Sequence, residues 1–380
     1  ALESGVLMES FGNAKTVYNN NSSRFGKWCV IYFSASGKMS GCSMQTYLLE
    51  QSRIVAPSPA ERNYHIFYHM LAGASEEERA LYKLRPSHAD YLYTSGESKS
   101  PGIDDEATWK RVKLQLDVLG FSLVQQRTLT TLLSAVLTLG NVSFSGEGED
   151  TMCSIEPHAL ILAAEMLQVD GETLGRVMRT RVVRISNTES VTVLLRPDQC
   201  RDTRNAIAKT LYAAVFDHLV DRINTTLSEG EMEEGRYIGL LDVFGFENFE
   251  NNSLEQLCIN FTNERLQQLF MDCLVKREQA EYAREGIQTS QIVYPDNSAQ
   301  IALIDGKVTG GSDENFVSRL HTAYDGKNPL YSRPKFGAAA VGADLGRAMD
   351  KLQFVIVHYA EAVQYTAYEW LEKNRPSPSP

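Results

Sequence analysis

The chain has 380 residues, of which 43% are hydrophobic and 22% charged, and its formal net charge is −11. This length and apolar content allow a large buried core and predict two or three lobes. The negative net charge disfavours nucleic acid as a partner, and no apolar run approaches the roughly 20 residues that a membrane span needs. Six scattered cysteines without a CxxC pair favour a reducing compartment, and seven histidines without an HExxH pattern predict no transition-metal site.

The first two thirds of the chain predict a short helix, a polar loop, two strands and a helical lobe. Apolar residues at helical spacing end at Gly12, and the polar loop Asn19 to Lys27 follows. The apolar run 28–33 and the segment 43–49 predict strands paired around the turn Ser36-Gly37-Lys38. Helical periodicity predicts the lobe at residues 61–72, 104–119, 122–139, 157–167, 171–179 and 202–227.

An apolar strand and an acidic turn open the last third. Residues 237–241 form a continuous apolar run, typical of a strand buried on both faces, with Asp242 at its carboxyl end. Ligands of open α/β sheets bind beyond the carboxyl ends of the strands, so we expect a nucleotide at the loop after Asp242. A capping box at Ser253 to Gln256 predicts a helix through Arg284 that transmits motion from this loop. Further on, we expect a strand and short helix in 291–308, a helix at 316–323 and strands in 354–364.

The polar loop and the acidic turn contain the oxygen ligands of a magnesium–nucleotide site. We expect Ser23 to give its hydroxyl to Mg²⁺ and Asp242 to hold the water shell of the metal. Ser22 and Asn19 are expected to position water and phosphate oxygens. We therefore interpret the polar loop as a phosphate sensor.

The remaining roles fall to three residues, two of them in the acidic turn. Gly245 is expected to offer its backbone N–H to the γ-phosphate. Arg24 and Glu247 are expected to form a charge-assisted pair that closes behind the phosphate when both loops move inward. Either motif alone is a weak signal, but the two together, beside an apolar strand and a long capped helix, indicate a functional site.

Several segments closely resemble myosin motor domains. Residues 9–16, the loop 19–27 and residues 241–247 resemble the switch I and switch II regions, and residues 61–68, 255–264 and 370–374 match further segments of the family. The likeness spans nearly the whole chain. It implies an α/β fold of the P-loop NTPase type, with central transducer strands surrounded by many helices. Residues 1–235 would then form the upper part and residues 236–380 the lower part of the actin-cleft region.

The resemblance also implies ligands, partners and a location. ATP and Mg²⁺ would be the cofactors, and Asn13 and Lys15 are expected among the residues that bind them. The segment 185–195 would touch the actin filament, with Glu189 at a position where the family has an acidic residue or a phosphorylatable hydroxyl. We expect a permanent negative charge there and no phosphorylation switch. The protein would be a cytoplasmic, cytoskeletal motor whose light chains or calmodulin bind outside this segment.

The chain also departs from the family pattern. The motif G-x-x-x-x-G-K-[ST] is absent, because each Gly-Lys pair is followed by Trp, Met, Val or Asn. The family has this loop before the segment that Ala1 opens, so we expect the chain to begin inside a larger protein and to bind ATP poorly by itself. The stretch after Lys307 is shorter than in the family: either it is truly deleted, which would weaken actin binding, or it is missing from this sequence. Thr289 stands near the position of the usual relay-loop tryptophan. A catalytically idle actin tether stays open as an alternative, although the Arg24 and Glu247 pair favours an enzyme.

Overall fold

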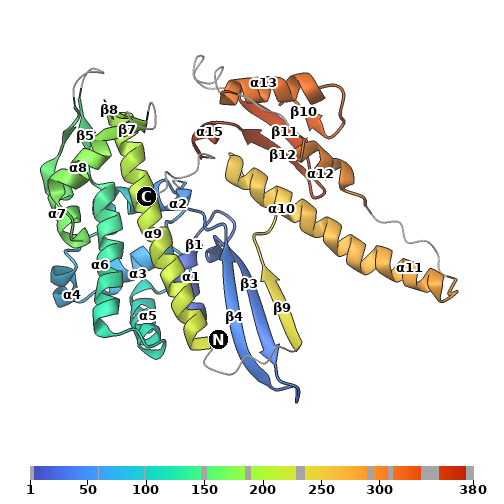
Figure 1. Ribbon diagram of the computed structural model, residues 1–380, viewed down its shortest axis with the longest axis horizontal. Helices are drawn as coiled ribbons and strands as arrows, with labels where there is room; N and C mark the ends of the chain where they lie inside the picture. Colours follow the sequence, from blue (N-terminus) through green and yellow to red (C-terminus); the bar gives the residue numbers. More distant parts are fainter. Residues whose placement is uncertain are drawn as a thin grey trace. The chain divides into compact units, whose positions relative to one another are not determined.

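The computed structural model divides into two compact units, Ala1–Val243 and Phe244–Pro380, and each is described by itself (Figure 1). The described residues are 4–58, 60–97, 99–146, 152–184, 190–227, 236–288, 295–306, 311–334 and 351–373. They form a mixture of helices and small sheets. Among these residues, none of the helices combines the length and the hydropathy that crossing a membrane requires.

The first unit contains most of the helices. They are α1 (Ser4–Gly12), α2 (Ser52–Val55), α3 (His65–Gly73), α4 (Glu76–Leu81), η1 (His88–Asp90), η2 (Leu92–Thr94), α5 (Asp105–Val118), α6 (Leu123–Gly140), α7 (Pro157–Leu167), α8 (Gly171–Arg179) and α9 (Pro197–Leu227). The strands are β1 (Asn13–Ala14), β2 (Ser22–Ser23), β3 (Gly26–Phe33), β4 (Met39–Tyr47), β5 (Phe144–Ser145), β6 (Ser154–Ile155), β7 (Thr180–Arg184), β8 (Ser190–Leu194) and β9 (Arg236–Asp242). The helical lobe is confirmed, with α9 beginning at Pro197 rather than at Asp202.

Side-chain caps explain why several helices begin where the sequence predicts. The Asp104 carboxylate accepts the N–H of Ala107 at 2.9 Å before α5. Before α6, Ser122 and Gln125 form a reciprocal capping box, with N–H to side-chain oxygen distances of 2.9 and 3.3 Å. These bonds satisfy N–H groups that have no partner inside the helix, so the polar residue before each apolar run sets the start of the helix.

The core of the first unit forms where α9 crosses α1 and α3. Tyr212 of α9 is fully buried, stacks on Tyr64 with ring centroids 5.0 Å apart, and lies 5.3 Å from the ring of Phe67. Its hydroxyl donates to the carbonyl oxygen of Phe11 at 2.7 Å. The aromatic cluster therefore fixes the end of α1, and with it the start of the polar loop that follows.

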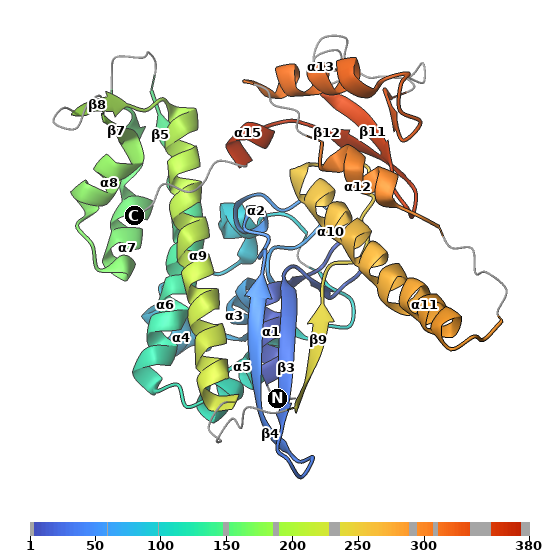
Figure 2. The same ribbon diagram turned by 45° about the vertical axis from the view of Figure 1, so that its right-hand side comes forward.

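A three-stranded antiparallel sheet, ordered β4-β3-β9, lies beside α9 (Figure 2). The predicted hairpin is confirmed: β3 and β4 pair around a turn in which Gly37 has a φ of +79°, a conformation that favours glycine. The amide of Asn224 in α9 accepts the N–H of Met44 and donates to its carbonyl, both at 2.8 Å. This amide attaches the helix to the backbone of β4.

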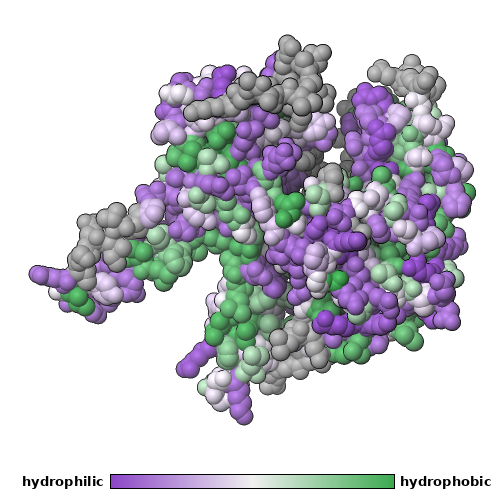
Figure 3. All heavy atoms as spheres, turned by 180° about the vertical axis from the view of Figure 1, so that it is seen from behind, coloured by the Kyte–Doolittle hydropathy of each residue, from purple (hydrophilic) through white to green (hydrophobic). Residues whose placement is uncertain are grey.

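The prediction that the strand before Asp242 is buried on both faces is wrong. β9 is an edge strand that pairs with β3, and Tyr237, Ile238, Leu240 and Leu241 keep 49 to 63% of their surface exposed. Figure 3 shows the hydrophobic surface along this sheet. The pairing is also antiparallel, so the rule for ligands beyond parallel strands does not place Asp242. Its place follows instead from the register with β3.

The second unit packs helices against a small sheet. Its elements are α10 (Leu254–Met271), the π-helix η3 (Asp272–Lys276), α11 (Arg277–Arg284), α12 (Ser298–Ile304), α13 (Asp313–Tyr324), β10 (Tyr331–Ser332), β11 (Gln353–Val357), β12 (Ala362–Thr366) and α15 (Trp370–Lys373). The predicted helix through Arg284 is confirmed, including the Ser253 N–H bonded to Gln256 at 3.0 Å. The sheet has the order β10-β11-β12, and buried Phe354 and Tyr365 stack 5.6 Å apart in its core.

Replacing Asn224 by alanine is expected to destabilise the first unit. Asn224→Ala leaves the N–H and the carbonyl of Met44 without this partner, so the free energy of unfolding should fall by about 1–3 kcal/mol. Denaturant unfolding measures the change. Thr225→Ala is the matched control, because that exposed hydroxyl donates to the carbonyl of Asp221 in its own helix. Equal stability of the two variants would contradict a stabilising role for the two hydrogen bonds between Asn224 and Met44.

Candidate functional site

After α1, strands β1 and β2, of two residues each, form a hairpin, and the residues that connect them include the first part of the polar loop. β1 and β2 pair antiparallel, with Asn13 opposite Ser23 and Ala14 opposite Ser22. Asn13 is buried, and its amide nitrogen donates to Oδ1 of Asn21 at 3.0 Å. The two serines are half-buried. Ser22 and Ser23 therefore lie at the end of the connecting loop, and Asn13, the first residue of the hairpin, helps to hold that loop through Asn21.

Hydrogen bonds inside the loop give it a defined shape. The backbone N–H of Thr16 donates to the carbonyl of Asn19 at 2.8 Å, and the Thr16 hydroxyl accepts the N–H of Asn19 at 3.2 Å. The Asn19 side chain accepts the N–H of Asn21 at 2.9 Å while remaining exposed. Lys15 donates to the carbonyl of Ala60 at 3.3 Å and lies 3.7 Å from a carboxylate oxygen of Glu97. The loop is thus a closed turn with an exposed amide at its tip.

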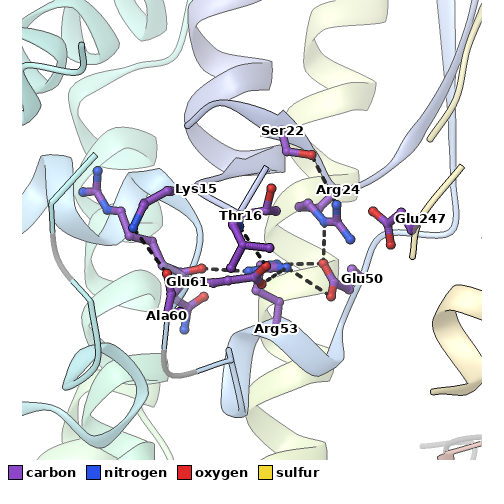
Figure 4. Close-up of polar contacts among 12 residues, drawn as sticks. Lys15, Thr16, Ser22, Arg24, Glu50, Arg53, Ala60, Glu61 and Glu247 are labelled. Atoms are coloured by element: carbon purple, nitrogen blue, oxygen red, sulfur yellow. Dashed lines mark hydrogen bonds and ion pairs between the residues drawn. The ribbon is translucent and has the colours of Figure 1, made fainter. Parts of the chain in front are cut away.

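Behind the loop lies a cluster of four charged residues, shown in Figure 4. Arg24 is only 1% exposed, and its Nε donates to Glu50 at 2.6 Å while Nη1 donates to the Ser22 hydroxyl at 3.2 Å. Arg53 donates to the same carboxylate at 2.7 Å and to Glu61 at 2.8 Å. Two positive and two negative side chains make the cluster neutral by count, which offsets the cost of burying each charge.

The cluster shifts the proton equilibria of its members. Burial by itself would raise the pKa of Glu50, but Arg53 and Arg24 outweigh it and hold the pKa below its ordinary value. Burial would lower the pKa of Arg53, but Glu50 reverses that effect and raises it. The cluster therefore keeps its charges, and Glu61 extends it to the loop by accepting the N–H of Val17 at 3.2 Å.

Strand pairing brings Asp242 beside Lys27, four residues after the serine hairpin, although the two are far apart in sequence. Lys27 of β3 lies opposite Asp242 of β9, and the Lys27 Nζ is 3.5 Å from the Asp242 carboxylate. Because the Asp242 side chain is 60% exposed, its oxygens remain accessible. Hydroxyl and carboxylate oxygens are the ligands that Mg²⁺ prefers, so the residue types of Ser23 and Asp242 fit this metal.

In the second unit, side-chain amides of α10 hold the turn that contains Glu247. Oδ1 of Asn260 accepts the N–H of Glu247 at 2.9 Å, and its Nδ2 donates to the carbonyl of the same residue at 2.7 Å. Asn263 donates to the carbonyl of Phe244 at 3.0 Å, and Gln256 donates to the Glu247 carboxylate at 3.2 Å. Three side chains of one helix therefore fix the backbone and the carboxylate of the turn.

The structure brings together some of the predicted site residues. Asn13, Lys15, Asn19, Ser22, Ser23 and Arg24 share the loop and its hairpin, and Asp242 joins this group through β9. Gly245 and Glu247 belong to the second unit. The predicted pair of Arg24 and Glu247 spans both units and stays a prediction. Glu189 lies outside the described residues, as does Thr289.

Sequence analysis missed the residues that hold the site in place. Glu50 lies two residues before α2 and Arg53 lies within it, three positions apart, a spacing typical of ordinary surface ion pairs. Asn260 was part of a recognised helix without an assigned role. What distinguishes Asn260 is that a polar side chain is buried on an otherwise regular helix. Burial is not visible in a single sequence, so sequence analysis could not have found this residue.

Comparison with known proteins identifies the family. Residues 1–377 match the family described as Myosin head (motor domain). Myosin IB heavy chain of Dictyostelium discoideum is 38% identical over 400 residues, covering 98% of this chain and 34% of that protein. Unconventional myosin heavy chain 6 of Caenorhabditis elegans is 38% identical over 394 residues, covering 99% and 18%. Myosin-1 of Arabidopsis thaliana is 39% identical over 389 residues, covering 98% and 32%.

This chain belongs to the myosin head (motor domain) family. It spans about a third or less of the length of the relatives named above.

Replacing Glu50 by glutamine is expected to destabilise the first unit in a pH-dependent way. Glu50→Gln leaves two buried guanidinium groups without their shared carboxylate, so the free energy of unfolding should fall by about 3–5 kcal/mol at neutral pH. The folded state holds the pKa of Glu50 below the ordinary 4.5. The stabilisation is therefore complete above that value and is lost as the pH falls through the folded pKa.

Denaturant unfolding at neutral pH and below pH 4.5 tests this expectation. The difference between wild type and Glu50→Gln should shrink at the lower pH. Glu106→Gln is the matched control, because Glu106 pairs with Lys110 on the surface of one helix, and its replacement should change the unfolding free energy little. A Glu50 variant that behaves like the control would exclude a structural role for the cluster.

Proposed function

We propose that this chain is the part of an actin-based, ATP-hydrolysing myosin motor that detects the nucleotide and passes its state on. Membership in the myosin head family supports this proposal. The observation that carries it is the pairing of β3 with β9, which brings the Asp242 carboxylate beside the strand that leads from the serine hairpin. In this proposal the two segments, distant in sequence, provide the hydroxyl and carboxylate oxygens of one magnesium site.

In this proposal, residues of the loop and its hairpin bind Mg²⁺ and the nucleotide together with Asp242 of β9. Ser23 holds Mg²⁺ with its hydroxyl, and Asp242 holds the metal through water. When bound, the ion neutralises charge on the ATP phosphates. Asn13 and Lys15 belong to the nucleotide-binding residues, and Asn19 presents its exposed side chain to phosphate oxygens.

The catalytic part of the proposal concerns four residues. Ser22 positions water, and Gly245 gives its backbone N–H to the terminal phosphate. Arg24 and Glu247 form the pair that closes behind the phosphate. The Ser22 hydroxyl already accepts a hydrogen bond from Arg24, so a change at Arg24 reaches this hydroxyl directly.

The helix that starts at α10 is proposed to transmit the state of the Glu247 turn. Asn260 and Asn263 bind the backbone of this turn on both sides of Gly245. A displacement of the turn must therefore either break these bonds or move the helix with it. Because the helix continues through η3 and α11 to Arg284, its far end is displaced as well.

Actin is the proposed macromolecular partner. Strand β8 lies within the segment 185–195 and pairs with β7, and Val182 of β7 and Val191 and Val193 of β8 are exposed. We propose that this hairpin, with Glu189, contacts the filament. Residues 1–235 and 236–380 would be the upper and lower parts of the actin-cleft region. The protein would work in the cytoplasm on the cytoskeleton, with light chains or calmodulin bound outside residues 1–380.

Reversing the proposed ion pair tests the enzymatic function. In the whole protein, Arg24→Glu should abolish actin-activated ATP hydrolysis, because two acids would then face each other. Adding Glu247→Arg should partly restore it by re-forming the pair with opposite polarity. Steady-state turnover with and without actin measures both effects. Restoration is expected to be incomplete, since Arg24→Glu also removes a guanidinium that neutralises half-buried Glu50.

Two measurements make this test decisive. Thermal unfolding of each variant separates loss of the pair from loss of the fold. Glu250→Arg reverses a charge at an exposed position in the same turn and should leave turnover unchanged. Turnover that survives both single changes at Arg24 and Glu247 would remove the pair from the mechanism, and actin binding without hydrolysis in wild type would identify a tether instead of an enzyme.

A further inference from the structure

A chain of buried hydrogen bonds runs behind Asn260 in the second unit. Nδ2 of Asn260 donates to the Tyr365 hydroxyl at 2.9 Å, and that hydroxyl lies 2.8 Å from Nε2 of His358. Nδ1 of His358 lies 3.1 Å from Oε1 of Glu264. Asn260, Glu264 and Tyr365 are 0% exposed and His358 is 3% exposed. These side chains come from α10, from β12 and from the segment that joins β11 to β12.

Counting donors and acceptors fixes the direction of each bond. Glu264 accepts the N–H of Tyr359 at 2.8 Å and Nδ2 of Asn297 at 2.5 Å, so both of its side-chain oxygens act as acceptors. It therefore accepts a hydrogen bond from the Nδ1–H of His358. The Tyr365 hydroxyl already accepts from Asn260, and burial raises its pKa, so it keeps its proton and donates to Nε2 of His358.

This arrangement requires a neutral imidazole with its proton on Nδ1. A doubly protonated ring would point a second donor at the Tyr365 hydroxyl and would leave the hydroxyl proton without an acceptor among the described residues. A buried carboxylate that orients a neutral histidine, which in turn accepts from a hydroxyl, is also the arrangement of catalytic triads. Here the hydroxyl is held by an amide instead of facing a substrate.

This chain of hydrogen bonds from Glu264 through His358 and Tyr365 to Asn260, called the relay below, also contacts the Glu247 turn directly. The ring of Phe246, next to Glu247, packs edge-on against His358 with centroids 5.4 Å apart and against Tyr359 at 5.8 Å. The amide of Asn260 uses both protons of Nδ2, one for Tyr365 and one for the Glu247 carbonyl, while Oδ1 accepts the Glu247 N–H. Because the Tyr365 hydroxyl donates its proton to His358, it can only accept from Asn260, so it favours the same amide orientation that the Glu247 backbone requires.

We propose that Glu264, His358 and Tyr365 act as positioning residues for Glu247 by fixing the orientation of the Asn260 amide. With the amide in this orientation, one side chain clamps both the N–H and the carbonyl of Glu247. With the amide reversed, an oxygen would face the Glu247 carbonyl and a nitrogen would face its N–H, so both bonds would be lost. This inference rests on the proposed function, because it assigns Glu247 a place in ATP hydrolysis.

Tyr365→Phe in the whole protein tests the relay. The variant keeps the ring that packs on Phe354 and removes only the hydroxyl. We expect the rate of the hydrolysis step, measured by chemical quench, to fall roughly tenfold while the KM for ATP stays within about twofold. Tyr359→Phe is the matched control, because it removes a tyrosine hydroxyl one residue past His358 without touching the relay. A Tyr365 variant that hydrolyses ATP as fast as this control would overturn the proposal.

Nitrogen-15 NMR of histidine-labelled protein tests the relay independently of activity. The chain has seven histidines, and His358→Gln identifies the signals of His358. We expect the pattern of a neutral ring protonated at Nδ1, altered in Tyr365→Phe and unchanged in Tyr359→Phe. A charged ring or a proton on Nε2 would refute the relay. If wild type hydrolyses no ATP, the proposed function fails, and the NMR pattern by itself decides whether the relay exists.

Discussion

The first unit depends on a buried guanidinium that must be neutralised. Arg24 follows directly on the serine hairpin and is almost completely shielded from water, so the loop can fold only if a carboxylate meets it. Glu50 does so, but it is shared with Arg53, which then requires Glu61. Each buried charge in the cluster needs an oppositely charged neighbour. Glu61, the last member, pairs with Arg53 and also accepts the backbone N–H of Val17. The shape of a polar, exposed loop is thus set by charges beneath it.

In the second unit, neutral side-chain amides rather than charged groups hold the backbone of the Glu247 turn. A side-chain amide has a donor and an acceptor on one rigid group, so Asn260 can bind both backbone groups of Glu247. Both of these bonds are made to the backbone of Glu247, and its carboxylate accepts a hydrogen bond from the neutral amide of Gln256. The turn is therefore positioned largely through its backbone.

Local patterns predicted the elements well, and the site less completely. Helix starts were recognisable because Asp104 and Ser122 cap the helices through bonds to residues three positions away. The hairpin was recognisable because Gly37 marks its turn. The environment of Arg24 was not, because Glu50 is 26 positions away and the spacing carries no signal. The burial of β9 was mispredicted for a related reason: an apolar run shows that a strand can be covered, and only the neighbouring elements determine whether it is.

The buried face of α10 holds the Glu247 turn in one register on this helix. Gln256, Asn260 and Glu264 recur every fourth residue and form a polar stripe, each with different partners. An apolar stripe would tolerate sliding or rotation, since one aliphatic contact replaces another, but a stripe of directional hydrogen bonds has a single register. The π-helix at Asp272–Lys276 begins only after this stripe ends. π-Helical turns are frequent sites of kinks, so a change in helix direction is least costly there, beyond the residues that hold the turn.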